Sequence, residues 1–429
     1  MYEGELPVAP DPGGPAGHRE SQALRLAAAQ SRLPVSRGGL GLSGAEGLAA
    51  LSYLCATGRS LPTVLEAFSA AVPAARAQEL FAPHWPEALA ALPDAVREGI
   101  PTLDTFCQGY PDRLYQRLRQ LLETQQQEAL EQATVEAGVG VRQQRRLVAV
   151  RMPGASSWLT ARPTGTGDRC YLSPDDSRFC YRYWLGLQLA HMAQLGAADP
   201  YDAHDLLRGP VEGAVILVHG AVQRELLAIL EAQGERPSWE DEGIFAHCPE
   251  PHRPDLVWGD RVSGVPHAID VVTVGAQGQS ADGTRDTADV GERRKAVEYA
   301  SVLAHTPGVT LVAFGIDTFG GLGQGARRFI ALLAERRMQH MRRVEDDEVD
   351  TRLRYFYTQR VVLALLRAQA HVVRRRCTQR APVGWQTVLE RTLRADHALA
   401  RAAALDDEPD DPVGQADLAI VDVPLMAFG

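Results

Sequence analysis

The feature that most restricts the fold of this chain is a short apolar run with one charged residue inside it. Residues 268–274 read AIDVVTV, a composition typical of a strand that is buried on both faces of a sheet. Asp270 interrupts this run, and a lone carboxylate in a buried strand is costly unless it binds a partner. The run therefore predicts a covered sheet that contains a functional carboxylate.

A second carboxylate lies on the preceding predicted strand. Asp255 begins the stretch 255–259, and a turn over residues 260–266 leads back into the strand of Asp270. Two strands joined by so short a turn pair in antiparallel fashion, which would bring both carboxylates to one cation. A Pro-Asp pair before a strand is also common as a plain turn, and this alternative stays open.

The third candidate is a lysine. The chain contains 43 arginines and a single lysine, Lys295, which lies in a helix predicted over residues 290–305. Arginine can replace lysine where either cation serves, but its planar fork does not reproduce a compact ammonium group. Lys295 is therefore a marked position, although its survival by chance is the alternative interpretation.

Two aspartates and a lysine suit the hydrolysis of a phosphodiester bond. Carboxylates hold a hard divalent cation, Mg²⁺ or Mn²⁺, which polarises the phosphate and lowers the pKa of an attacking water. We expect Asp255, Asp270 and the peptide carbonyl of Val271 to bind this cation. Lys295 would then orient the water or neutralise charge on the phosphate.

The helix predicted before the strands, over residues 211–233, carries two further candidates for the catalytic set. Glu225 is a candidate for an additional carboxylate, with Glu242 as a weaker alternative. His219 is a candidate catalytic residue, although a histidine at helical spacing is more often part of a core.

The apolar pattern predicts an α/β chain of the α+β type, and the candidate residues above place a nuclease domain in its second half. After a mostly helical region, one helix, three strands, another helix and a last strand follow, the αβββαβ order of the restriction-endonuclease-like core. Strands are expected at 243–247, 255–259, 267–274 and 309–316, and a basic strand or strand-like linker is expected earlier, at 142–152. The predicted divisions are a disordered N-terminus (1–23), a helical linker region (24–205), the nuclease domain (206–345), an Arg-rich helical region (346–404) and an acidic tail (405–429).

Charge is distributed unevenly along the sequence. The net charge is −10, yet residues 326–395 hold 16 arginines against 7 acidic residues, a balance of +9. Residues 396–429 hold 8 acidic residues and one arginine. A basic block beside an acidic tail is typical of a surface that binds a polyanion such as DNA. The alternative is a solvated helix face followed by a disordered tail.

The sequence shows no sign of export or of a membrane segment. Its first residues lack the basic and apolar pattern of a signal peptide, and no apolar run reaches about 18 residues. Six scattered cysteines indicate reduced thiols rather than a disulfide framework. These features predict an intracellular protein that does not contact a membrane, and a nuclear one if its source is eukaryotic.

In their order and spacing, these motifs resemble the PD-(D/E)XK constellation of metal-dependent nucleases. The chain is similar to the C-terminal region of non-LTR retrotransposon proteins, which carry a restriction-like endonuclease after the reverse transcriptase. The resemblance rests on Asp255, Asp270, Lys295, Tyr299, His219 and the segments 32–42, 157–161, 182–187 and 319–326. The zinc knuckle of that family and the signature of its polymerase are missing from this sequence.

The resemblance implies an endonuclease that nicks or cuts double-stranded DNA, with a reverse transcriptase or element RNA as a further partner. In the simplest motif the lysine lies two residues after the second acid, but Val272 occupies that position here, so the following helix has to supply it. The alternative is a catalytically inactive nucleic-acid-binding or scaffold protein. The intact acidic pair and lysine favour the endonuclease, whereas the missing knuckle and the negative net charge favour the scaffold.

Overall fold

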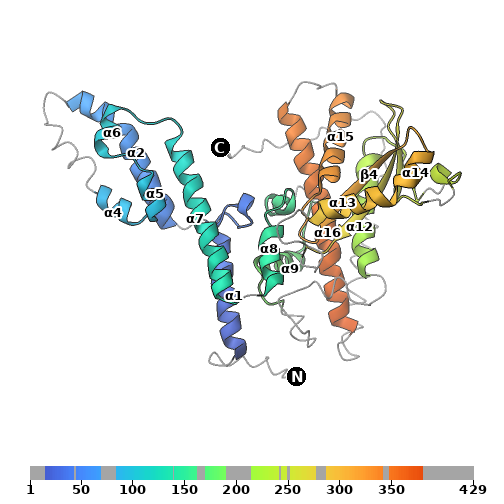
Figure 1. Ribbon diagram of the computed structural model, residues 1–429, viewed down its shortest axis with the longest axis horizontal. Helices are drawn as coiled ribbons and strands as arrows, with labels where there is room; N and C mark the ends of the chain where they lie inside the picture. Colours follow the sequence, from blue (N-terminus) through green and yellow to red (C-terminus); the bar gives the residue numbers. More distant parts are fainter. Residues whose placement is uncertain are drawn as a thin grey trace, which may run out of the picture. The chain divides into compact units, whose positions relative to one another are not determined.

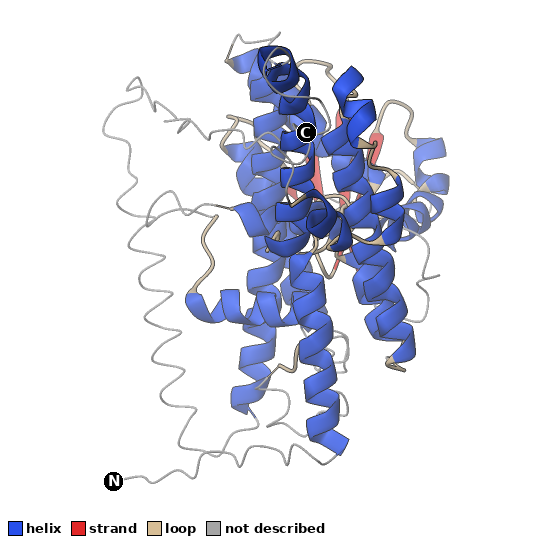
Figure 2. Cartoon of the chain, turned by 90° about the vertical axis from the view of Figure 1, so that its left-hand side faces the viewer, coloured by secondary structure: helices blue, strands red, loops and turns tan. Residues whose placement is uncertain are grey.

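The computed structural model is mostly helical and contains one four-stranded sheet (Figure 2). It describes residues 15–42, 45–68, 84–138, 140–161, 170–189, 214–240, 243–248, 252–276, 287–341 and 347–379. This mixture of helices and strands confirms the predicted α+β class. The acidic tail lies outside the described residues. None of the described helices is both long and apolar enough to cross a membrane.

The elements follow one another along the described chain as labelled in Figure 1. The α-helices are α1 (Pro15–Arg32), α2 (Ala45–Phe68), α4 (Trp85–Ala90), α5 (Asp94–Glu98), α6 (Leu103–Gln108), α7 (Leu114–Glu136), α8 (Val141–Ala149), α9 (Pro174–Leu185), α12 (Ala214–Glu231), α13 (Thr287–Glu298), α14 (Ala300–His305), α15 (Gln324–His340) and α16 (Asp347–Gln379). The strands are β1 (Ser238–Trp239), β2 (Leu256–Gly259), β3 (Pro266–Val274) and β4 (Thr310–Asp317). Short 3-10 helices are η1 (Val35–Arg37), η2 (Ala155–Thr160) and η3 (Gly243–Phe245).

The described residues belong to two compact units. One unit lies within Gly41–Leu130, where α2, α4, α5, α6 and the first part of α7 bury a shared apolar core. The other lies within Met1–Leu40 and Glu131–Gln386 and contains the sheet. All the candidate site residues that the structure describes lie in this sheet unit.

The sheet has the strand order β1-β2-β3-β4. β1 pairs with β2, and β2 with β3, in antiparallel fashion, whereas β3 and β4 are parallel. The predicted hairpin is confirmed, with Leu256 paired to Ile269 and Gly259 to Pro266. Because parallel strands need a crossover connection, the chain passes through α13 and α14 between β3 and β4.

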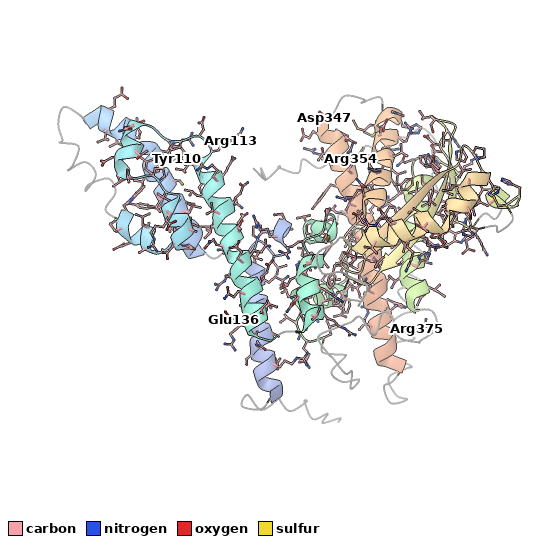
Figure 3. All side chains as sticks on the ribbon, in the orientation of Figure 1. Tyr110, Arg113, Glu136, Asp347, Arg354 and Arg375 are labelled. Carbon is pink, nitrogen blue, oxygen red and sulfur yellow. The ribbon has the colours of Figure 1, made fainter. Side chains whose placement is uncertain are left out.

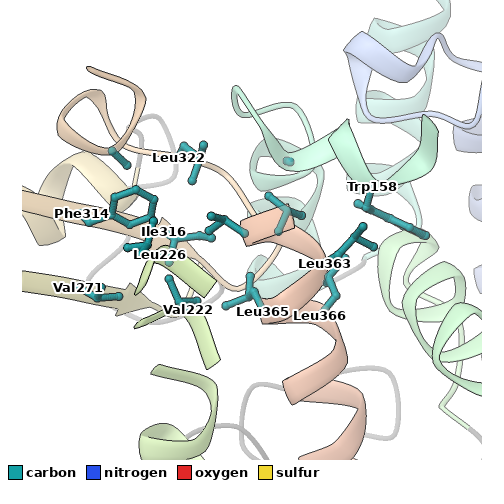
Figure 4. Packing of buried hydrophobic residues seen from close by; sticks show 14 of the residues in the cluster. Trp158, Val222, Leu226, Val271, Phe314, Ile316, Leu322, Leu363, Leu365 and Leu366 are labelled. Atoms are coloured by element: carbon teal, nitrogen blue, oxygen red, sulfur yellow. The ribbon is translucent and has the colours of Figure 1, made fainter. Parts of the chain in front are cut away.

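Successive residues of β3 face two different apolar clusters. Ile269 and Val271 pack into the large core that also holds residues of α12, α15 and α16 (Figure 4). Ala268 packs instead with Tyr299 and with Val302 of α14. Since side chains alternate along a strand, Asp270 points to the same side as Ala268, toward α13 and α14.

Helix α13 is fastened to the start of α15 by two of its acidic side chains. The buried carboxylate of Glu292 accepts hydrogen bonds from the backbone N–H groups of Gly315 (3.0 Å), Gly325 (2.7 Å) and Ala326 (2.9 Å). Asp289 accepts a further one from the N–H of Gln324 at 2.6 Å. Carboxylates at a helix N-terminus satisfy free N–H groups and the helix dipole. These bonds fix the position of α13, and therefore of Lys295 one turn later.

The close approach of Glu292 explains the glycine turn that precedes α15. A Cβ atom built on Gly323 would lie 2.3 Å from Glu292 Oε1, and one on Gly315 would lie 2.6 Å from Glu292 Cγ. Real Cβ atoms essentially never come this close to another heavy atom, so a side chain at either position would displace the Glu292 side chain that bonds to the backbone of β4 and α15.

The β2–β3 turn is held by Asp260, which is almost completely buried. Its carboxylate accepts hydrogen bonds from Arg336 Nε (3.1 Å) and Nη2 (2.7 Å) on α15 and from the Val262 N–H (3.0 Å) inside the turn. Burial acts to raise the pKa of Asp260, but the bonds from Arg336, Ser263 and Val262 outweigh it and hold the pKa at about 2. This ion pair ties the hairpin, and hence its register, to α15.

Three expectations about local structure are wrong. Residues 243–247 form the short helix η3 and a turn rather than a strand, and the additional strand is Ser238–Trp239. Residues 141–149 form α8 rather than a basic strand, since arginine and glutamine are good helix formers and Arg146 and Leu147 are buried. Residues 15–23, expected to be disordered, belong to α1.

We predict that Asp260→Asn destabilises the protein by about 2–4 kcal/mol at neutral pH, because it breaks a buried ion pair. The folded pKa of Asp260 is about 2, below the ordinary 3.8, so its contribution is present above the ordinary value and lost as pH falls toward 2. Urea unfolding at about pH 7 and about pH 2.5 should therefore show a much smaller loss in acid. The exposed Asp175→Asn serves as control, and an equal loss at both pH values would contradict the ion-pair account.

Candidate active site

Asp270 lies at the centre of a buried polar cluster on the α13 side of the sheet. Its side chain is 6% exposed. Tyr299 donates a hydrogen bond from its hydroxyl to Asp270 Oδ2 at 2.6 Å, and Lys295 Nζ lies 3.3 Å from Oδ1. Burial raises the pKa of Asp270, the charge of Asp255 acts in the same direction, and Tyr299 and Lys295 oppose the rise. The predicted neighbours of Asp270 are thus brought together.

Asp255 lies beside Asp270, as the hairpin requires. Leu256 pairs with Ile269, so the next position of the same antiparallel register places Asp255 opposite Asp270. The Val271 N–H donates a hydrogen bond to Asp255 Oδ2 at 2.7 Å. His219 Nε2, from α12, lies 3.2 Å from the same oxygen. His219 therefore joins the cluster through Asp255, and Asp255 Oδ1 has no hydrogen bond within the described part of the chain.

Tyr299 is buried beside Asp270 and is packed between two aromatic rings. It is 1% exposed and packs edge-on against Phe245 of η3 and against the ring of His252. Burial raises the pKa of Tyr299, and its hydrogen bond to Asp270 raises it further. The phenol therefore stays protonated and donates to Asp270 at any ordinary pH.

Lys295 faces two carboxylates at once. Its Nζ lies 3.3 Å from Asp270 Oδ1 and 3.3 Å from Glu298 Oε1, and its side chain is 21% exposed. Glu298 is 45% exposed and lies three residues after Lys295 on α13, so it stands at the solvent side of the cluster. Glu298 was not among the residues predicted from the sequence, although its i,i+3 spacing from the lone lysine was a usable signal.

Glu225 does not join this cluster. Its carboxylate is buried and lies 2.6 Å from Arg360 Nε of α16, in an ion pair between α12 and α16. A carboxylate on a buried helix can form an ion pair with a neighbouring helix as readily as it can take part in catalysis. The two roles give the same sequence pattern. The prediction of Glu225 as a catalytic carboxylate is thus not supported by its placement, and Glu242 lies outside the described residues.

Five of the described arginines of the predicted basic block have acidic partners. Arg336 and Arg360 are buried in ion pairs with Asp260 and Glu225. On the surface of α16, Arg354 pairs with Asp350 at 2.6 Å and Arg352 pairs with Glu348. Arg374, also on α16, pairs with Asp176 of α9 at 2.6 Å. Figure 3 labels Arg354 and Arg375 toward opposite ends of this helix. The excess of positive charge counted from the sequence is therefore partly neutralised by the fold.

The donor set suits a magnesium-type ion. Each aspartate has one oxygen anchored by the protein, Asp255 by Val271 and His219, and Asp270 by Tyr299. The described residues contain no group of three or more His, Cys, Asp or Glu side chains arranged to hold a metal. Mg²⁺ is usually held by one or two carboxylates together with waters and substrate phosphates, so two aspartates and a peptide carbonyl fit it better than a zinc-type cage.

We predict that Asp270→Asn does not destabilise the metal-free protein and raises its thermal unfolding temperature slightly. The substitution removes a desolvated charge that Asp255 repels, whereas the amide can still bond to Tyr299. Thermal unfolding in EDTA measures the effect, with Asp260→Asn as a contrasting buried aspartate. A loss of stability as large as that of Asp260→Asn would show that Asp270 is kept for the fold rather than for a ligand.

Comparisons with known proteins give this arrangement no family. No protein-family model matches the chain, and no curated protein matches it. The resemblance to retrotransposon endonucleases therefore stays an inference from the motifs. What the cluster can do has to be derived from its own chemistry: two adjacent carboxylates, one ammonium group, a phenol and a histidine around the edge of a hairpin.

Proposed function

We propose that this protein is a metal-dependent endonuclease that hydrolyses phosphodiester bonds of duplex DNA. The observation that carries the proposal is the meeting of Asp255 and Asp270 on one hairpin with Lys295 on the crossover helix. The order α12, β1, β2, β3, α13, β4 supports it, because it follows the αβββαβ order of restriction-endonuclease-like cores. Two features deviate locally from that order: strand β1 has only two residues, and the crossover helix is divided into α13 and α14.

Each side chain has a role that its contacts allow. A bound Mg²⁺ or Mn²⁺ would supply Lewis acidity and an activated water, held by Asp255, Asp270 and the carbonyl of Val271. His219 and the Val271 N–H orient Asp255 through its Oδ2. Tyr299 orients Asp270 through a hydrogen bond to its Oδ2. Lys295 provides a point charge for the scissile phosphate as negative charge develops on it.

The outer face of α13 offers a surface for the DNA backbone. Arg293 and Arg294 immediately precede Lys295, are exposed, and have no acidic partner among the described residues. They contrast with Arg352 and Arg354 of α16, which are paired with acids of their own helix. Because unpaired arginines beside the site can neutralise phosphates without breaking an ion pair, we place the first DNA contacts on α13.

A catalytically inactive nucleic-acid-binding protein is the second candidate. It is favoured by the contact of His219 with Asp255 and by the ion pair of Lys295 with Asp270, which give both carboxylates a partner within the protein. Such compensated clusters also occur as structural networks. In this case cleavage would be absent from the parent protein, while salt-dependent DNA binding would persist.

We predict that Lys295→Arg lowers the rate of plasmid nicking roughly a hundred- to a thousand-fold while DNA affinity is kept. The positive charge is conserved, so general attraction to phosphate survives, but the broad guanidinium misplaces the charge needed in the transition state. The exposed Arg328→Lys, a swap in the opposite direction on α15, should leave nicking unchanged. If Lys295→Arg cuts as fast as the parent in Mg²⁺, the lysine has no catalytic role.

We predict that Arg293→Gln/Arg294→Gln weakens binding to duplex DNA. The fall of log affinity with log salt should also become less steep, by about 2 in the slope. Fluorescence anisotropy with a labelled duplex at several salt concentrations measures both quantities. The control is Arg352→Gln/Arg354→Gln, which removes the same charge from α16. An equal effect of the two double variants would mean that net charge, rather than the face of α13, determines the binding.

A further inference from the structure

The position of Lys295 raises a problem for the binding of a divalent cation. Asp270 Oδ2 accepts the hydrogen bond of Tyr299, which is buried and packed on both sides and so cannot easily turn away. Asp270 Oδ1, the oxygen left for a metal, has the Lys295 ammonium at 3.3 Å. Two cations on one oxygen repel each other, and burial strengthens the repulsion.

Glu298 offers the ammonium a second position. Its Oε1 also lies 3.3 Å from Lys295 Nζ, so the ammonium is already shared between a buried and a half-exposed carboxylate. The backbone of Glu298 is held in place, because its carbonyl oxygen lies 3.0 Å from His252 Nε2. A small rotation of the flexible lysine side chain would transfer it fully to Glu298 without moving α13.

We propose that Glu298 is a positioning residue that takes over the Lys295 ammonium when a divalent cation binds Asp270. The transfer frees Asp270 Oδ1 for the metal and moves the ammonium to the solvent side of the site, where a phosphate would arrive. This inference rests on the proposed metal-dependent function. It goes beyond that function because it assigns a role to a residue outside the predicted nuclease motif.

An ordinary surface ion pair is the plain alternative. Exposed i,i+3 pairs of Glu and Lys contribute little and are interchangeable with solvent. Lys295 differs from such pairs because its other partner is Asp270, whose side chain is 6% exposed. Removing Glu298 would therefore leave the ammonium on the buried carboxylate that the metal needs, whereas removing a surface partner elsewhere would have no such consequence.

The test is the affinity for Mn²⁺, measured by isothermal titration calorimetry on the full chain without DNA. We expect Glu298→Gln to weaken Mn²⁺ binding roughly threefold to tenfold. In a Lys295→Ala background there is no ammonium to displace, so Glu298→Gln should change the affinity less than about twofold. Glu231→Gln, at an exposed position of α12, controls for the loss of one negative charge.

Each outcome decides between the alternatives. Weakening in the parent background alone supports the transfer of the ammonium. Equal weakening in both backgrounds would show that Glu298 acts only as a nearby charge, and no weakening in either would show that Lys295 does not compete with the metal; both overturn the inference while the metal site stands. If the parent protein binds no Mn²⁺, the proposed function fails together with the inference.

Discussion

The parallel pairing of β3 and β4 is the constraint on which the rest of this site depends. A parallel pair cannot be closed by a turn, so the chain has to cross over the sheet between the two strands. The crossover is α13 followed by α14, and it carries Lys295 and Tyr299 over the face to which Asp270 points. Glu292 then fastens this helix to three backbone N–H groups around the start of α15.

Much of this arrangement could be predicted from the sequence because it depends on short-range rules. The apolar run around Asp270 identified a buried strand, and the short turn identified the hairpin that sets Asp255 opposite Asp270. Val272 occupies the place where the simplest motif has its lysine, and the structure brings Lys295 to Asp270 from the next helix, as expected from the sequence. These inferences needed only alternation, turn length and the chemistry of single residues.

The partners of charged residues could not be predicted in the same way, because they depend on tertiary packing. Glu225 was predicted as a catalytic carboxylate, but it pairs with Arg360 of α16. The turn residue Asp260 pairs with Arg336 of α15. Counting charges along the sequence therefore overestimated the free basic surface of α15 and α16. Glu298 was missed for the opposite reason, since it lies on the exposed side of a helix and only its shared contact with Lys295 makes it notable.

The central claim is that Asp255 and Asp270 together hold one divalent cation. The most direct measurement is a crystal structure of the protein with Mn²⁺, in which anomalous scattering locates the ion. The account predicts a single strong site with oxygens of both aspartates and the Val271 carbonyl at about 2.0–2.5 Å, and Lys295 turned toward Glu298. Manganese bound elsewhere, with Lys295 still paired to Asp270 at saturating metal, would contradict it.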